Sequence, residues 1–206
     1  MSKELEIKVP TDWNDITIGM YQKFQKVVSD DKMSAEEKNV HIVSILCNVD
    51  AVTLINIRHS DIRGIVKSIM KLVDDKPNTE ELIKRVKFNG KEYGFIPNMK
   101  EISMGEYVDI ETLCKDASNN LHKIMAILYR PIVKDTGARY SIANYEQDEY
   151  VNDKFKEFPM FPSLSALNFF FLLGKKLPYV LNNYSLKQSR TRFKKILLQA
   201  NGVGIT

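Results

Sequence analysis

A seven-residue pattern that opens helices occurs twice in this sequence and constrains the fold more than any other feature. Residues 15–21 and 101–107 share an acid, an isoleucine, a hydroxyl residue, an apolar residue, a glycine, a variable residue and a tyrosine. The side chains of Thr17 and Ser103 can cap a helix, and the isoleucine before each cap can contact the tyrosine four positions into that helix. We therefore expect two helices that begin at equivalent points, with their tyrosines in the same environment.

A second match lies downstream of each copy of the pattern. An Asn-x-His triplet is followed by an Ile-Leu pair in residues 39–46 and again in residues 120–128. Each copy therefore predicts a helix followed by a second helix, with connections of different length between them. Two related helical hairpins are one interpretation, and chance similarity between amphipathic helices is the other.

Apolar residues recur at helical spacing over most of the chain. This spacing predicts a helix opened by Ser34, where Glu37 completes a capping box, and another opened by Ser60. Residues 158–162, which contain two prolines, predict a stiff apolar connector. Further helices are expected from Ser103 onward and over residues 119–129, 145–156, 164–177 and 185–199. The predicted fold class is mainly α.

One β-hairpin interrupts the helices. Residues 85–88 and 91–96 alternate between apolar and polar residues, and Asn89-Gly90 between them favours a type I′ turn. An isolated hairpin is only marginally stable in water, so we expect it to pack against helices. The side chains expected at that contact are Val86, Phe88, Tyr93 and Phe95. Residues 139–143 predict a further short strand.

Length and composition fit one compact domain built from three parts. The chain has 206 residues, 44% hydrophobic and 27% charged, which excludes disorder for its bulk. We expect a helical unit over residues 1–76, the hairpin plus a second helical unit over 77–157, and an apolar helix plus a basic helix over 158–206. The predicted architecture is a helical bundle with two related helical-hairpin units and one small β-hairpin.

The formal net charge of +4 is unevenly distributed. The first 157 residues hold 23 basic and 26 acidic residues and carry a net charge of −3, whereas no Asp or Glu follows Glu157. The basic residues after Glu157 are Lys175, Lys176, Lys187, Arg190, Arg192, Lys194 and Lys195. We expect this basic end to meet an acidic surface on another protein or another copy of the chain. Contact with DNA phosphates and an ordinary solvated helix face are the alternatives.

The sequence contains little that indicates catalysis. The histidines His41, His59 and His122 lack metal-ligand spacing, although His41 and His122 occupy matching places in the repeat. Cys47 and Cys114 are isolated and have no base at a recognisable spacing, and glycine-rich phosphate loops are absent. We therefore expect no enzymatic activity, no cofactor and no metal site.

A strongly apolar run near the C-terminus is a candidate contact surface. Residues 164–173 contain Phe169, Phe170 and Phe171 but are too few to span about 30 Å of hydrocarbon as a helix. We therefore expect no membrane partner. A core helix is one interpretation; because the run is apolar on nearly all sides, a second chain is also expected to cover part of it. The candidate interaction residues are these three phenylalanines and the seven basic residues after Glu157.

Several stretches resemble a known class of proteins. Residues 90–98 (GKEYGFIPN), 102–111 (ISMGEYVDIE) and 120–132 (NLHKIMAILYRPI) are similar to small structural or assembly proteins of tailed bacteriophages, including the crAss-like group. Residues 17–24 and 169–177 resemble the first helix and the late apolar helix of such proteins. The resemblance implies a head, neck or tail component, such as a head–tail connector or ring, and it implies no catalytic residues.

Together these observations predict a non-enzymatic virion structural protein. It would be made in the host cytoplasm, enter the virion, and contact other phage structural proteins and copies of itself. Two alternatives stay open at this point. One is a tail assembly chaperone, and the other is a non-specific nucleic-acid-binding protein that uses its basic C-terminal helix on phosphates.

Overall fold

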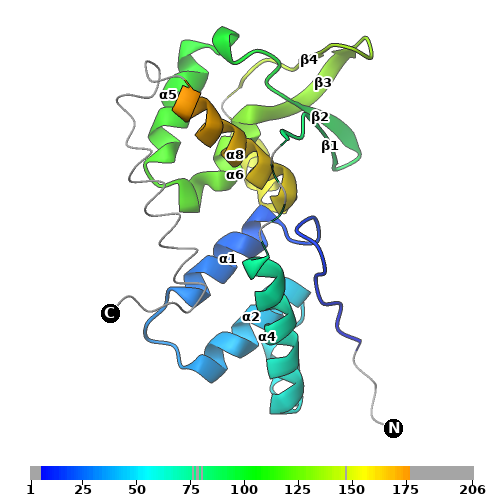
Figure 1. Ribbon diagram of the computed structural model, residues 1–206, viewed down its shortest axis with the longest axis vertical. Coiled ribbons are helices and arrows are strands. Elements are labelled where there is room, and N and C mark those ends of the chain that lie inside the picture. Colours follow the sequence, from blue (N-terminus) through cyan, green and yellow to red (C-terminus); the bar gives the residue numbers. More distant parts are fainter. Residues whose placement is uncertain (1–5, 76, 78, 80, 147, 177–206) are drawn as a thin grey trace.

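The computed structural model describes residues 6–176 except 76, 78, 80 and 147, and the side chains of Tyr150 and of residues 171–176 also lie outside the description. The described chain is mainly helical and carries a small antiparallel sheet, as the sequence predicts. In Figure 1, α1, α2 and α4 form one end of the molecule, and the sheet, α5, α6 and α8 form the other.

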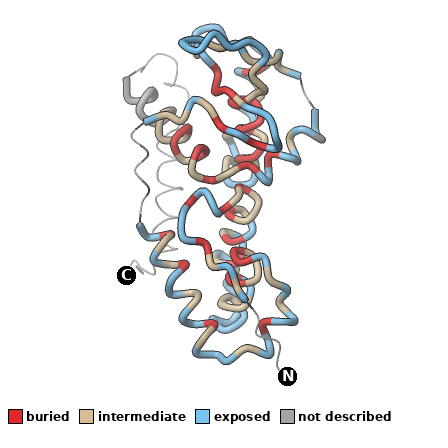
Figure 2. The backbone as a smooth tube through the Cα atoms, turned by 90° about the vertical axis from the view of Figure 1, so that its right-hand side faces the viewer, coloured by how far each residue is buried: buried red, intermediate tan, exposed pale blue. Residues whose placement is uncertain are grey.

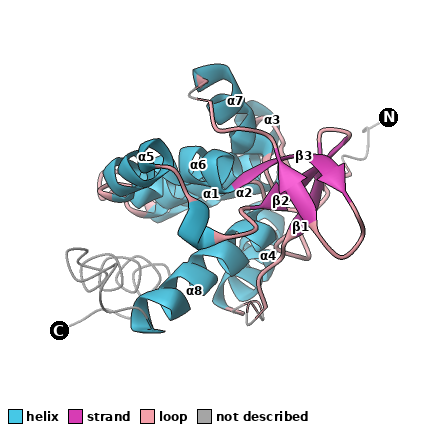
Figure 3. Cartoon of the chain, turned by 90° about the horizontal axis from the view of Figure 1, so that it is seen from above, coloured by secondary structure: helices cyan, strands magenta, loops and turns pink. Residues whose placement is uncertain are grey.

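The elements follow one another with short connections. The first helices are α1 (Ile18–Val28), α2 (Ala35–Cys47), α3 (Ala51–Leu54) and α4 (His59–Asp74). They are followed by β1 (Arg85–Phe88), β2 (Lys91–Phe95), the 3-10 helix η1 (Met99–Glu101), α5 (Met104–Cys114) and α6 (Ala117–Leu128). The remaining elements are β3 (Tyr129–Asp135), β4 (Tyr140–Ile142), α7 (Glu149–Lys154), the 3-10 helix η2 (Phe155–Glu157) and α8 (Met160–Lys176). Seen from above, α7 and α8 lie on opposite sides of α6 (Figure 3).

Three of the four predicted helix caps are confirmed. Thr17 Oγ1 accepts a hydrogen bond from Met20 N at 3.2 Å. Ser34 and Ser103 form complete capping boxes with the glutamates three residues later. The predicted cap at Ser60 is wrong, because α4 already begins at His59 and the Ser60 hydroxyl donates to Asp61 at 3.3 Å. Side-chain hydrogen bonds therefore cap the starts of α1, α2 and α5, whereas α3, α4 and α6 begin without a side-chain cap.

The hairpin turns at Asn89-Gly90 as predicted, since both residues have positive φ, 47° and 72°. It belongs, however, to a four-stranded antiparallel sheet with the order β1-β2-β3-β4, so the expectation of a small hairpin alone is incomplete. The strand that the sequence analysis missed is β3, because Pro131 in its interior is typical of a break. Pro131 still takes part through its carbonyl, which accepts from Ala143 N at 2.9 Å just beyond the end of β4.

Aromatic side chains join the sheet to the helices. The Phe88 ring lies 5.4 Å from that of Phe155 and 5.3 Å from that of Phe158. Phe95 lies 5.3 Å from Tyr129, whose hydroxyl donates to Ile83 O at 2.7 Å. The predicted packing of the hairpin is therefore confirmed. Figure 2 shows buried backbone running through both ends of the molecule, consistent with one continuous hydrophobic cluster.

The start of α8 is held by the N-terminal part of the chain. Ile18 N donates to Phe158 O at 2.9 Å, and Met160 N donates to Ile16 O at 2.8 Å, which makes a short antiparallel bridge. Helix α8 begins at Met160, so the predicted connector over residues 158–162 is wrong for its last three residues. Pro162 is tolerated there because a proline in the first turn of a helix removes no internal hydrogen bond.

The two halves of the sequence repeat form paired helices but do not share an environment. Helix α1 contacts α2, and α5 contacts α6. Tyr21 is buried, with 6% exposed, whereas Tyr107 is 38% exposed, so the prediction that the two tyrosines share one environment is wrong. His41 is likewise exposed and His122 buried. Tyr21 and Tyr107 differ in environment because of the orientation of α5.

Candidate functional site

Helix α5 presents apolar side chains to solvent. Met104 is 76% exposed, Val108 is 47% exposed and Tyr107 is 38% exposed. The three residues are spaced i, i+3 and i+4, so they lie next to one another on one side of the helix. We refer to Met104, Tyr107 and Val108 as the α5 stripe.

The opposite side of the same helix buries a carboxylate. Glu106 is 5% exposed. Its Oε1 accepts from Arg130 Nη2 at 2.5 Å, and its Oε2 accepts from Ser103 N at 2.6 Å. The Arg130 side chain, on β3, is 13% exposed, so the ion pair is buried between helix and sheet. A charge removed from water in this way must be paired to be tolerated.

The buried Glu106 sets the orientation of the α5 stripe. Residues two positions apart on an α-helix point about 200° apart, because each residue turns the helix by about 100°. Met104 and Val108, two positions before and after Glu106, therefore point away from the protein interior. In α1 the residue at the position of Glu106 is Met20, and there the next residue, Tyr21, is the buried one. The ion pair thus distinguishes the two copies of the repeated pattern.

Carboxylates bound the α5 stripe at both ends. Glu101, three residues before Met104, is exposed, and its Oε1 accepts from Asn98 Nδ2 at 2.6 Å. Glu111, three residues after Val108, is half-buried. The sequence from Glu101 to Glu111 contains four acidic residues and no Lys or Arg. The site is therefore an apolar strip within an acidic segment, a composition suited to a basic amphipathic partner.

The structure places only part of the predicted interaction residues. Phe169 and Phe170 are half-buried in α8, with their rings 5.6 and 5.9 Å from that of Phe95. They therefore pack on the sheet, and cover of this helix by another chain stays a prediction. Helix α8 also contains Phe171, Lys175 and Lys176, whose side chains are not described. The remaining predicted residues, Lys187, Arg190, Arg192, Lys194 and Lys195, lie outside the described residues.

Sequence reasoning missed the α5 stripe although its spacing is visible in the sequence. The helix also has apolar residues on its other side, where Ile110 and Leu113 pack against the core. Periodicity alone cannot tell which side faces inward. The deciding contact is made by Arg130, which lies in the strand that the sequence analysis did not predict.

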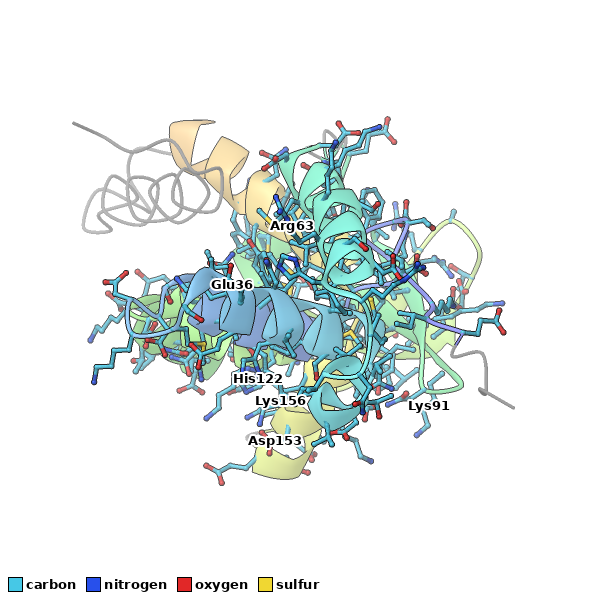
Figure 4. All side chains as sticks on the ribbon, turned by 90° about the horizontal axis from the view of Figure 1, so that it is seen from below. Glu36, Arg63, Lys91, His122, Asp153 and Lys156 are labelled. Carbon is cyan, nitrogen blue, oxygen red and sulfur yellow. The ribbon has the colours of Figure 1, made fainter. Side chains whose placement is uncertain are left out.

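His122 is the buried histidine of the repeat. Its Nε2 lies 4.0 Å from Asp153 Oδ1, which also accepts from Lys156 Nζ at 2.8 Å (Figure 4). Its Nδ1 has no hydrogen-bond partner among the described residues. Burial, followed by the positive charge of Lys156, holds the pKa of His122 below its usual value. The side chain is therefore kept neutral near pH 7.

The described residues include no group of three or more His, Cys, Asp or Glu arranged to hold a metal ion. Cys47 is buried and Cys114 is half-buried. Burial raises the pKa of Cys114 to about 11, which disfavours the reactive thiolate. Neither cysteine thus shows the lowered pKa that marks a nucleophile.

A shallow cleft of about 690 Å³ lies beside α4 and carries positive charge. Its lining includes Asn39 on α2 and His59, Arg63 and Lys67 on α4. The three α4 residues are exposed and follow one another at intervals of four, so they form one row on the helix. This row can attract anions, but it contains no nucleophile paired with a base.

Within the part of the chain that the structure describes, no helix combines the length and apolar character needed to cross a membrane. In comparisons with known proteins, no family model, curated protein or solved structure matches the chain.

Proposed function

We propose that this chain is a non-enzymatic assembly protein of a tailed bacteriophage particle that acts through protein–protein contacts. The bacteriophage setting rests on the sequence resemblance in residues 90–98, 102–111 and 120–132. The mode of action rests on one structural observation, the α5 stripe, which keeps Met104, Tyr107 and Val108 exposed in the single chain.

The composition of this surface supports a protein contact. Methionine and aromatic side chains are enriched at protein interfaces, and a polar rim surrounds their apolar centre. Contiguous apolar groups on a surface mark sites of interaction more often than scattered ones do. The buried Glu106–Arg130 pair fixes the helix to the sheet, so the stripe is held in one orientation before a partner arrives.

Purified particles provide the first test. We expect quantitative mass spectrometry to find the protein in finished particles at a defined copy number. A protein that is made during infection but is absent from finished particles would instead support the second candidate, an assembly chaperone that uses the same stripe transiently. If particles form normally after the gene is deleted, both candidate functions are contradicted.

A matched pair of variants tests the stripe itself. Val108→Glu places a charge in the α5 stripe, and Val133→Glu places the same charge on β3, at a side chain that is also well exposed (47% and 65%). We expect particle yield to fall with Val108→Glu and to stay near wild type with Val133→Glu. Equal yields would show that the stripe is not the contact surface.

A further inference from the structure

We propose that the row of His59, Arg63 and Lys67 on α4 binds the phosphate backbone of duplex DNA without reading its sequence. We refer to these three residues as the α4 row. This goes beyond the proposed function, because the row lies on a different helix from the α5 stripe and takes a different kind of partner. Helices α4 and α5 lie at opposite ends of the molecule (Figure 1), so one chain can hold DNA and a protein partner at the same time.

The cations of the α4 row are not used inside the protein. Arg63 and Lys67 are exposed, and neither forms an ion pair with another residue that the structure describes. The carboxylate closest to them in the sequence belongs to Asp61, and it pairs with Arg58 at 3.0 Å. Like charges four positions apart on a helix repel each other, so the row gains free energy when an anion binds beside both.

The length of the α4 row fits the charge spacing of a DNA strand. Each residue of an α-helix rises by about 1.5 Å, so residues 59 and 67 are about 12 Å apart along the axis of α4. One strand of duplex DNA carries a phosphate about every 3.4 Å of helix axis, and therefore about three to four phosphates over this length. A strand that runs along α4 thus places a phosphate near each member of the row.

The surface beside the row is open enough for a phosphate backbone to approach. Gly64 lies next to the row, and a Cβ placed on it would meet no atom within 4 Å. Ser60 and Ser68, one turn to either side of Gly64, are also small and exposed. Asn39 of α2 lines the same cleft, and side-chain amides are among the groups that commonly contact phosphates. The cleft therefore offers both charged and neutral donors to a phosphate strand.

The chemistry of the cleft favours duplex DNA over two other anionic partners, an acidic protein and single-stranded nucleic acid. A protein interface has an apolar centre, whereas none of the large apolar side chains exposed by the described chain lies on α4. Single strands are bound largely by stacking of bases on aromatic rings, and no Phe, Tyr or Trp is among the described residues that line the cleft. Contact with phosphates is left, and it carries no sequence information.

The salt dependence of DNA binding by the purified full-length protein tests this site. A short fluorescently labelled duplex is titrated at several salt concentrations, with anisotropy as the readout. Each neutralised phosphate contributes about −0.9 to the slope of log K against log salt, so Arg63→Gln/Lys67→Gln should make the slope shallower by about 1.8. The control Lys87→Gln/Lys91→Gln removes the same charge from exposed positions on the hairpin and should keep the wild-type slope.

The comparison of the two double variants isolates α4. Both variants keep the basic residues after Glu157, so any contribution of those residues to the slope is the same in each. Equal slopes in the two double variants, or absence of DNA binding by the wild-type protein, would overturn the proposal. If Arg63→Gln/Lys67→Gln binds DNA like wild type but lowers particle yield, the row instead contacts an acidic protein, which also overturns the proposal.

A pair of substitutions at Gly64 gives a second test that does not depend on fold stability. The space around a Cβ at this position is open, and Gln and Glu both favour a helix more than Gly does. Gly64→Glu places a carboxylate beside Arg63 and Lys67 and should weaken DNA binding by about tenfold or more relative to Gly64→Gln. Equal affinities would contradict the proposal. Both experiments use purified protein and DNA without particles, so their failure is separate from failure of the proposed function.

Discussion

Glu106 and Arg130, 24 residues apart in the sequence, form a buried ion pair with 2.5 Å between Oε1 and Nη2. The pair joins the first turn of α5 to β3 and directs the apolar side chains of the stripe toward solvent. One contact therefore links the packing of α5 against β3 to the set of α5 side chains that face solvent. A buried charge that loses its partner is costly, so this contact can be tested through stability.

Arg130→Met should destabilise the fold by about 3–5 kcal/mol, because it leaves the Glu106 carboxylate buried without its partner. The double variant Glu106→Leu/Arg130→Met should recover most of that loss, since it removes both charges. Urea unfolding measures each change.

Arg85→Met serves as the control for the buried pair. This change breaks the ion pair between Arg85 and Asp135. The Arg85 side chain is 31% exposed and the Asp135 side chain is 38% exposed. Solvent screens a pair of this kind, so the change should cost much less stability than Arg130→Met does. A loss for Arg130→Met no greater than this would contradict the importance of burial.

Gly94→Ala should destabilise the sheet by about 1–3 kcal/mol, because a Cβ on Gly94 would overlap the ring of Tyr140. That ring cannot move away easily, since its hydroxyl shares its one proton between Phe95 O at 2.8 Å and Lys84 O at 3.1 Å. Gly64→Ala is the matched substitution in open space on α4 and should stabilise by about 0.5–1 kcal/mol. Thermal unfolding distinguishes the two, and equal shifts would show that Tyr140 does not restrict this site.

Stability should fall as pH is lowered from 7 toward 5, in part because of His122. Burial and Lys156 lower the pKa of this histidine in the folded protein, so the unfolded chain binds the proton first. Its contribution is complete above the unfolded pKa of about 6.5 and is lost as pH falls toward the lower folded value. His122→Gln should flatten this part of the profile, measured by urea unfolding at several pH values. An unchanged slope in His122→Gln would contradict the role of this histidine.

The parts of the fold that could be predicted are those determined by residues close together in the sequence. The capping boxes at Ser34 and Ser103 and the turn at Asn89-Gly90 involve residues three or fewer positions apart, and all three were predicted correctly. Strand β3 depends on pairing with β2 and β4, and the start of α8 depends on its bridge to residues 16–18. Neither cause is visible in a local pattern.

The candidate site was harder to predict for the same reason. The α5 stripe faces solvent only because Glu106 finds Arg130 on a strand whose interior proline is typical of a break. The basic C-terminal residues were chosen from composition. The acidic partner that their charge suggests stays a prediction. A periodic apolar pattern predicts that a helix forms, whereas long-range contacts determine which side of that helix faces inward.

The opposite environments of Tyr21 and Tyr107 lead to a last prediction about the repeated pattern. Tyr21 is buried beside Trp13 and Phe24, with ring centroids 5.8 and 6.2 Å away, so Tyr21→Ala should cost about 3 kcal/mol or more. Tyr107→Ala removes a side chain that is 38% exposed and should cost less than about 1 kcal/mol.

The chain offers a direct optical readout for this comparison, because Trp13 is its only tryptophan. Tyr21→Ala removes a ring that contacts Trp13 and should change its fluorescence emission in the folded protein, whereas Tyr107→Ala should leave the emission unchanged. Urea unfolding followed by this fluorescence gives the free energies of both variants in one experiment. Equal losses of stability would mean that the two helices bury their tyrosines alike and that Glu106 does not set the orientation of α5.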